Sequence, residues 1–251
     1  MDVGALQRMS AGGNDSALLI VAHGSTRYAE AARPAAAHVA RLKAADPGRR
    51  VALGLLAGAP PVAEALAALD AARIAVVPFF MEDGYFTRVA IPRALGGDPR
   101  VRLCRPVGLN QRMAALITCH ARLGCAERGL DPAATTVVLV GHGSARAPGQ
   151  AAALRRHTAT VAASGAFACV CEAHLEEPPR LPETLAALRG SAVAVVGFFA
   201  GEGGHVRDDV PAALAAEQAA RRNAYPPVHN FGSVADNPAV TQIILEQAAT
   251  A

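Results

Sequence analysis

The sequence lacks the features that identify secreted, membrane-spanning and disulfide-rich proteins. Its opening stretch, MDVGALQRMSAGGNDS, has no basic segment followed by an apolar one, so no secretion signal is expected. The longest apolar runs, such as AVAVVGFFA, are far too short to cross a bilayer. Five cysteines form no C-x-x-C pair, which favours reduced thiols over disulfides or a zinc site. We therefore expect a cytoplasmic protein with no membrane partner.

Charge is also scarce, and it is not concentrated. Charged residues make up 18% of the chain, and a net charge of +3 is spread along it. A nucleic-acid surface would show a clustered basic stripe, so no nucleic-acid partner is expected. A few arginines remain compatible with a small acidic ligand. The chain has 251 residues, 52% of them hydrophobic, which suits one large domain or two small ones and leaves monomer and homodimer both open.

Self-similarity, in contrast, is abundant. The segment LLIVAHGSTR at 18–27 matches VVLVGHGSAR at 137–146. Likewise PFFMEDGYFTRVAIP at 78–92 matches GFFAGEGGHVRDDVP at 197–211. Both matches have the same offset of 119 residues, which predicts a duplicated unit.

The duplication predicts two domains, residues 1–127 and 128–251. In each half, short β-branched or apolar runs alternate with alanine-rich stretches of helical spacing. This alternation favours an α/β fold in which each domain is an open, mainly parallel sheet with helices on both faces. Ligands of such sheets bind beyond the carboxyl ends of the strands.

Histidines occupy that position in both halves. His23 and His142 end the first strand of their halves, and His205 follows the third strand of the second half. We expect His142 and His205 to face each other across one crevice. The first half has Phe86 at the position of His205, so only the second half carries both histidines.

A carboxylate is expected to join them. In the strand ACVCEAHLEEPP, alternation predicts that Glu172, His174 and Glu176 share one face. Glu176, near the strand end, should approach the crevice of His142 and His205. Two imidazoles and one carboxylate are suitable ligands for a divalent transition metal, and histidines are natural bases near neutral pH.

Some of these residues also have plain structural explanations. The serine of each H-G-S segment is well suited to cap the next helix. A hydrolase with Ser25 or Ser144 as nucleophile is a competing hypothesis, although the chain has no G-x-S-x-G elbow. Asp208 and Asp209 are candidates to cap a helix starting at Pro211.

Three motifs together resemble the CbiX/SirB family, the class II chelatases of cobalamin and sirohaem biosynthesis: HGS after a strand, LEEPP, and GGHVRDDVP. The resemblance implies two chelatase-like domains around a cleft and ATP-independent insertion of Co²⁺ or Fe²⁺ into the tetrapyrrole sirohydrochlorin. The metal would be a substrate, with no tightly bound cofactor. His142 and His205 match the catalytic, metal-binding histidines. Glu176 is the best match for the carboxylate that some members add, with Glu172 the fallback.

The substrate is a polycarboxylate, so arginines at the cleft mouth would bind it. Four arginines recur at the shared offset and are the candidates: Arg27, Arg88, Arg146 and Arg207. In the first half, Phe86 and Tyr85 would offer flat apolar surface to the macrocycle, beside His23. Because that half lacks the second histidine, a non-catalytic tetrapyrrole or metal carrier is the alternative function.

Overall fold

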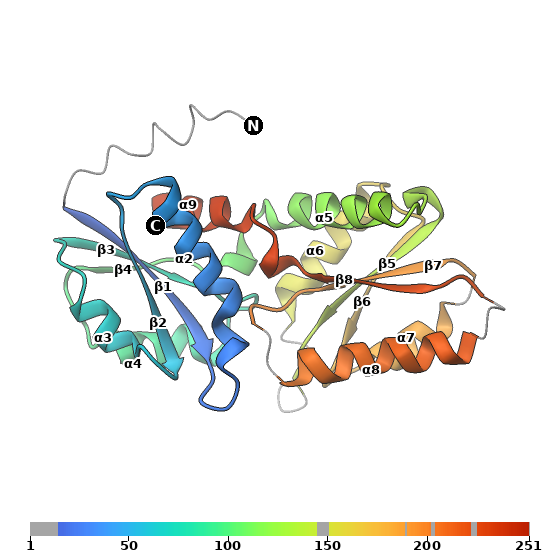
Figure 1. Ribbon diagram of the computed structural model, residues 1–251, viewed down its shortest axis with the longest axis horizontal. Coiled ribbons are helices and arrows are strands. Elements are labelled where there is room, and N and C mark those ends of the chain that lie inside the picture. The colour runs from blue at the N-terminus through green and yellow to red at the C-terminus, as the bar shows by residue number, and fades with distance from the viewer. Residues whose placement is uncertain (1–14, 145–150, 189, 202–203, 222–224, 251) are drawn as a thin grey trace.

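The computed structural model describes residues 15–144, 151–188, 190–201, 204–221 and 225–250, without the side chains of residues 29 and 204–207 (Figure 1). The first half contains β1 (Ser16–Gly24), α2 (Arg33–Ala45), β2 (Arg50–Ala57), α3 (Val62–Ala67), β3 (Arg73–Pro78), α4 (Ile91–Leu95), β4 (Val101–Leu103) and α5 (Met113–Glu127). The second half contains β5 (Thr135–Gly141), α6 (Ala152–Ala163), β6 (Cys169–His174), α7 (Leu181–Ala187), β7 (Ala192–Gly197), α8 (Gly204–Arg221), β8 (Val228–Ser233) and α9 (Val240–Thr250).

Each half forms a four-stranded parallel sheet, which confirms the predicted α/β fold. The strand orders are β2-β1-β3-β4 and β6-β5-β7-β8, so the two sheets have the same topology. All seven residues of β5 are buried, as expected for a central strand covered on both faces. The fourth strand of each sheet, β4 and β8, lies outside the apolar runs that predict strands in the sequence, namely LLIVA, VALGLL, RIAVVPFF, TVVLV, FACVCEAHL and AVAVVGFF.

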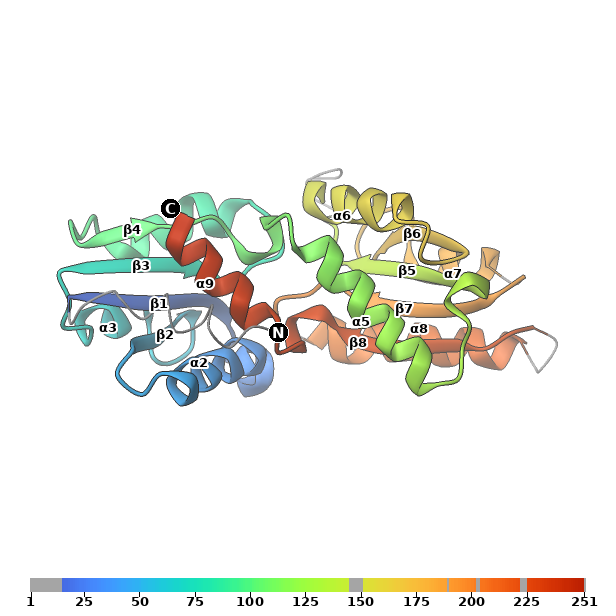
Figure 2. The same cartoon turned by 90° about the horizontal axis from the view of Figure 1, so that it is seen from above.

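The last helix of each half covers the sheet of the other half. Helix α9 packs against α2 and β3 of the first half, whereas α5 packs against α6, β7 and β8 of the second (Figure 2). Polar side chains fix this exchange, since Gln247 on α9 donates to the carbonyl of Pro106 at 2.9 Å. His120 on α5 likewise bonds to the carbonyl of Phe231 at 2.8 Å. The units repeated in the sequence are therefore interlocked in space.

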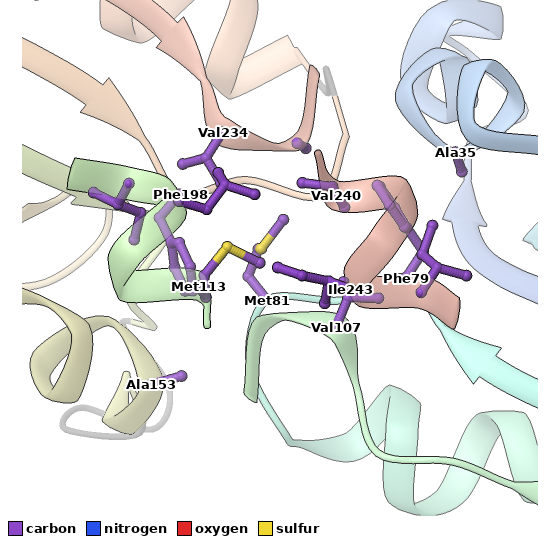
Figure 3. Close-up of a cluster of buried hydrophobic side chains, with 14 of the residues drawn as sticks. Ala35, Phe79, Met81, Val107, Met113, Ala153, Phe198, Val234, Val240 and Ile243 are labelled. Atoms are coloured by element: carbon purple, nitrogen blue, oxygen red, sulfur yellow. The ribbon is translucent and has the colours of Figure 1, made fainter. Parts of the chain in front are cut away.

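One hydrophobic cluster runs through both halves. It joins Phe79 and Met81 of the first half to Phe198 of the second, with Met113 from α5 and Ile243 from α9 between them (Figure 3). The opposite face of each sheet has a separate cluster, under α3 and α4 in one half and under α7 and α8 in the other. The shared cluster holds the carboxyl ends of both sheets against each other. Among the described residues, no helix is long and apolar enough to span a membrane.

Candidate functional site

The carboxyl ends of both sheets meet at one cavity of about 590 Å³. Both H-G-S segments and both Phe-Phe segments line it, together with the start of α6. The cavity lies where open parallel sheets bind ligands, because loops diverge there between strand and helix. His23 and His142, predicted to mark strand ends, both face this one cavity.

His23 is held by its own turn and by an aromatic neighbour. Its Nδ1 lies 2.8 Å from the carbonyl oxygen of Gly24, and because a carbonyl only accepts, Nδ1 carries the proton. Nε2 is then the ring nitrogen with a lone pair. The ring also meets Phe86 edge to face, with the centroids 4.5 Å apart. Gly24 has φ +67°, and a Cβ there would lie 2.1 Å from the carbonyl of Ala57, so this turn requires glycine.

An aromatic wall forms the first-half side of the cavity. Phe86 stacks on Phe80 at 6.0 Å and meets Tyr85 at 5.7 Å. Tyr85 is 64% and Phe86 41% exposed, values that are high for rings of this size. Phe86 begins a π-helical turn, Phe86–Ala90, that continues into α4, and such turns frequently occur at functional sites.

His142 occupies the equivalent place in the second half. Its exposed ring meets Phe199 at 4.9 Å. Its carbonyl accepts from the backbone N–H of Glu176 at 2.9 Å and of Leu175 at 3.2 Å. The turn after β6 therefore fixes the backbone of His142. Gly143 follows with φ +67°.

The carboxylates after β6 depart from the predicted alternation. Strand β6 ends at His174, so beyond it the side chains no longer alternate between faces. Glu176 is exposed and does not line the cavity, whereas Glu177 is buried with Oε1 3.9 Å from Nδ1 of His174. Glu172 lies on the other side of that imidazole, its Oε1 3.8 Å from Nε2. Of the predicted face, Glu172 and His174 do lie together.

The remaining predicted residues are described in part. The backbone of His205 and Arg207 lies in the first turn of α8, but their side chains lie outside the described residues, as does all of Arg146. Arg27 is exposed beside Tyr28. Arg88 is exposed and paired with Asp83 at 2.9 Å, which holds the pKa of Arg88 above its usual range.

The predicted helix start at Pro211 is wrong. Helix α8 begins at Gly204, and Pro211 lies inside it. Asp208 and Asp209 are therefore helical residues and not caps. A proline beyond the first turn removes one N–H donor, and its ring crowds the carbonyl four residues earlier, so prolines are uncommon there. Sequence reasoning placed the boundary at this proline because prolines usually mark the first turn.

Sequence reasoning also missed Glu82, which lines the cavity. Its two carboxylate oxygens accept from the backbone N–H groups of Ala153 at 2.9 Å and Leu154 at 2.8 Å, at the start of α6. Burial raises the pKa of Glu82, against the lowering effect of these two bonds. The only available signal was the difference between Glu82 and Gly201 at the same offset.

Among the described side chains, no group of three or more His, Cys, Asp or Glu is placed to hold a metal ion. Two exposed histidines in one cavity, an aromatic wall and Arg88 paired with Asp83 of the cavity lining nevertheless suit a flat, acidic ligand that exchanges protons. The site can accept protons at imidazoles and stack a planar ring system.

Comparisons with known proteins agree with this geometry. The CbiX family model matches residues 17–122 and 136–251. A "probable sirohydrochlorin cobaltochelatase" of Halobacterium salinarum is 26% identical, with 94% of this chain and 91% of that protein covered. A solved structure of CbiX, described as the terminal enzyme for biosynthesis of sirohaem in denitrifying bacteria, is 29% identical with a TM-score of 0.73, and the match covers 94% of this chain and 99% of that one.

A longer protein is similar as well. DR2241 of Deinococcus radiodurans is 29% identical with a TM-score of 0.82, and the match covers 94% of this chain. It is described as a multi-domain protein with structural similarity to chelatases and two additional novel domains. This chain spans 55% of its length.

Proposed function

The chain belongs to the CbiX family, and from that premise we propose that it inserts Co²⁺ or Fe²⁺ into sirohydrochlorin without ATP. The observation that carries the proposal is that the H-G-S histidines of both halves, His23 and His142, line one cavity with an aromatic wall. Relatives named as a sirohydrochlorin cobaltochelatase and as an enzyme of sirohaem biosynthesis support the substrate class.

The chemistry requires two events at the same four nitrogens. Two pyrrole N–H protons must leave while the metal arrives, and imidazoles near neutral pH can accept the former and ligate the latter. His142 and His205 are the proposed metal ligands and proton acceptors. Glu176, whose backbone N–H bonds to the carbonyl of His142, is the proposed carboxylate. Open coordination positions are needed because the ion must be released to the tetrapyrrole.

The internal repeat supports pairing His205 with His142. Phe86 is the first-half counterpart of His205, and its ring lies 4.5 Å from that of His23. Position 205 therefore corresponds to a place that is in contact with the H-G-S histidine in the other half. By the same logic the first half lacks the second ligand, and its role is to present Tyr85 and Phe86 to the macrocycle.

Substrate carboxylates would meet the arginines at the cleft mouth. Arg27 and Arg88 are both exposed, and Arg88 is anchored by Asp83 next to the aromatic wall. Arg146 and Arg207 are their second-half counterparts. Guanidinium groups suit this role because they bind carboxylates in bidentate fashion.

Metallation assays with Co²⁺, Fe²⁺ and Ni²⁺ in parallel test the proposal. The wild type should accelerate the absorption shift of sirohydrochlorin, and His142→Ala and His205→Ala should each slow it about 10²- to 10⁴-fold. His23→Ala should leave the turnover rate nearly unchanged. A protein that binds pigment stoichiometrically without speeding metallation would instead be a carrier.

Two further variants separate the parts of the site. Phe86→Ala should weaken pigment binding about tenfold, since stacked ring contacts contribute roughly 0.5–1.5 kcal/mol beyond their area. Ser25→Ala is the matched control. Its hydroxyl accepts from the backbone N–H of Arg27 at 3.1 Å and of Tyr28 at 3.0 Å, so it serves the turn. Loss of all activity in Ser25→Ala would favour the hydrolase hypothesis instead.

A further inference from the structure

Helix α6 receives its N-terminal cap from the other half of the molecule. The residue before the helix, Ala151, has no side chain that can cap it, and no side-chain cap bond is made at that position. The first N–H groups of any α-helix have no partner within the helix. Here the N–H groups of Ala153 and Leu154 both bond to Glu82, which is more than 70 residues earlier in the chain.

Glu82 belongs to the loop that carries the aromatic wall. Within this loop, Asp83 accepts from the Thr87 hydroxyl at 2.6 Å, and that hydroxyl accepts from the N–H of Gly84 at 2.9 Å. Asp83 also binds Arg88 at 2.9 Å. These bonds make the loop a single ordered unit, so whatever holds Glu82 also holds Phe86.

In the second half, the position equivalent to Glu82 carries no side chain. At the offset of 119 residues, Gly201 replaces Glu82. Gly201 instead packs directly on the other half, since a Cβ there would lie 2.3 Å from the carbonyl oxygen of Ala31. One loop thus reaches across the cavity with a carboxylate, and the other makes close backbone contact.

We propose that Glu82 is a positioning residue: by capping α6 it fixes the distance between the aromatic wall of the first half and His142 of the second. Both Glu82 and the start of α6 line the cavity, and Leu154 and Ala151 border it beside His142. A planar substrate between Phe86 and His142 fits only if that separation is held. This role rests on the proposed chelatase function, whereas the cap itself does not.

The cap is tested first, without substrate. Hydrogen exchange of the Ala153 and Leu154 amides should be at least about tenfold faster in Glu82→Ala than in the wild type, because both amides lose the carboxylate to which they donate. The first turn of α2 in the same protein serves as the internal reference. Unchanged exchange in α6 would overturn the proposal, whether or not the protein is a chelatase.

Substrate measurements then test positioning. Glu82→Ala should raise KM for sirohydrochlorin, and the Kd for pigment measured without metal, about tenfold, with kcat changed less than about twofold. A role in stability alone would lower the amount of folded protein and leave both constants unchanged. Faster exchange with unchanged KM and Kd would also overturn the proposal. Pigment binding without metallation in the wild type would refute the chelatase function. The Kd of Glu82→Ala for pigment, compared with that of the wild type, would still test the positioning role.

Conservative variants separate reach from charge. Glu82→Gln keeps the length and one good acceptor, so it should recover part of the lost affinity. Glu82→Asp keeps the charge but is shorter by about 1.5 Å, so it should behave like Glu82→Ala. Full recovery of pigment affinity in Glu82→Asp, with none in Glu82→Gln, would show that the charge of residue 82 and not its capping bonds determines the affinity. Glu64→Gln, on the exposed face of α3, is the matched control and should resemble the wild type.

Discussion

The buried histidine His38 should make the stability of this protein depend on pH in a measurable way. Its side chain is fully buried, with Nε2 2.8 Å from the carbonyl oxygen of Ala235 and Nδ1 2.8 Å from the hydroxyl of Thr241. Because a carbonyl only accepts, Nε2 carries the proton and the hydroxyl donates to Nδ1. The imidazole is therefore neutral, and burial lowers its pKa from 6.5 to about 4.

The sign and size of the effect follow from linkage. Between pH 6.5 and about 4, the imidazole of His38 binds a proton in the unfolded chain but not in the folded protein. The free energy of unfolding therefore falls as the pH falls through this window. With about 1.36 kcal/mol per pKa unit, the loss is about 2–3 kcal/mol at pH 4.5 and levels off at about 3 kcal/mol below pH 4. It is close to zero at about pH 7.5.

Urea unfolding followed by circular dichroism, at about pH 7.5 and about pH 4.5, measures this loss. His38→Gln is the matched variant, since its amide can donate to Ala235 and accept from Thr241 without titrating. Every other group titrates in both proteins, so the wild type should lose about 2–3 kcal/mol more than the variant. Equal losses would refute the neutral, buried imidazole and the packing of α9 on which it depends.

Three further substitutions should have large and different effects. Arg221→Ala should lower the free energy of unfolding by about 3–5 kcal/mol in urea, because the fully buried guanidinium binds a glutamate and three carbonyl groups; a loss below about 1 kcal/mol would contradict that burial. Gly143→Ala should lower the free energy of unfolding by at least about 1–2 kcal/mol, since φ is +67° and the new Cβ would lie 2.6 Å from Cγ of Glu177. Metallation should also slow in this variant, and a wild-type rate would show that this turn does not affect the reaction. Gly201→Ala should lower the free energy of unfolding by about 1–3 kcal/mol in the same urea assay, because the new Cβ would push the two halves apart at Ala31. Pigment binding should also weaken, and an unchanged free energy of unfolding would show that the backbones are not in close contact there.

The fold could largely be predicted because, within each half, apolar strand runs alternate with helical stretches, and this alternation is visible in short windows of the sequence. Apolar runs such as LLIVA and VVLVG became the central strands, and the H-G-S segments after them lie at the carboxyl edge as parallel sheets require. The outer strands β4 and β8 were missed because β4 has no fully buried residue and β8 has one, Phe231, so neither shows a clear apolar pattern. The exchange of α5 and α9 was missed because the apolar pattern of a helix shows which of its faces is buried but not which sheet covers that face.

The candidate site was predictable only where it follows strand ends. His23 and His142 are fixed by the strands before them, and so they meet in the cavity. Glu176 was placed by alternation, but alternation stops where β6 ends at His174, and the buried carboxylate is Glu177. Glu82 acts across more than 70 residues, and no local pattern carries such information.

The repeated histidines show why an internal repeat alone does not identify a functional residue. The offset of 119 residues relates His23 to His142, and it also relates His38 to His157. The second pair is buried, and burial lowers the pKa of both members. Each second-pair ring packs near a core phenylalanine and bonds to a carbonyl of the opposite half, at 2.8 Å for His38 and 2.7 Å for His157.

The two pairs of histidines therefore have different roles: the buried pair is structural, and the exposed pair lies at the cavity. His38 and His157 are buried, and each bonds to a backbone carbonyl of the opposite half, so these bonds stabilise the packing of the two halves. The histidines exposed at the strand ends instead line the cavity, where open parallel sheets bind their ligands. Within the proposed chelatase, substitution of His157 should then reduce stability and leave KM unchanged in the protein that remains folded, opposite to the effect expected for Glu82.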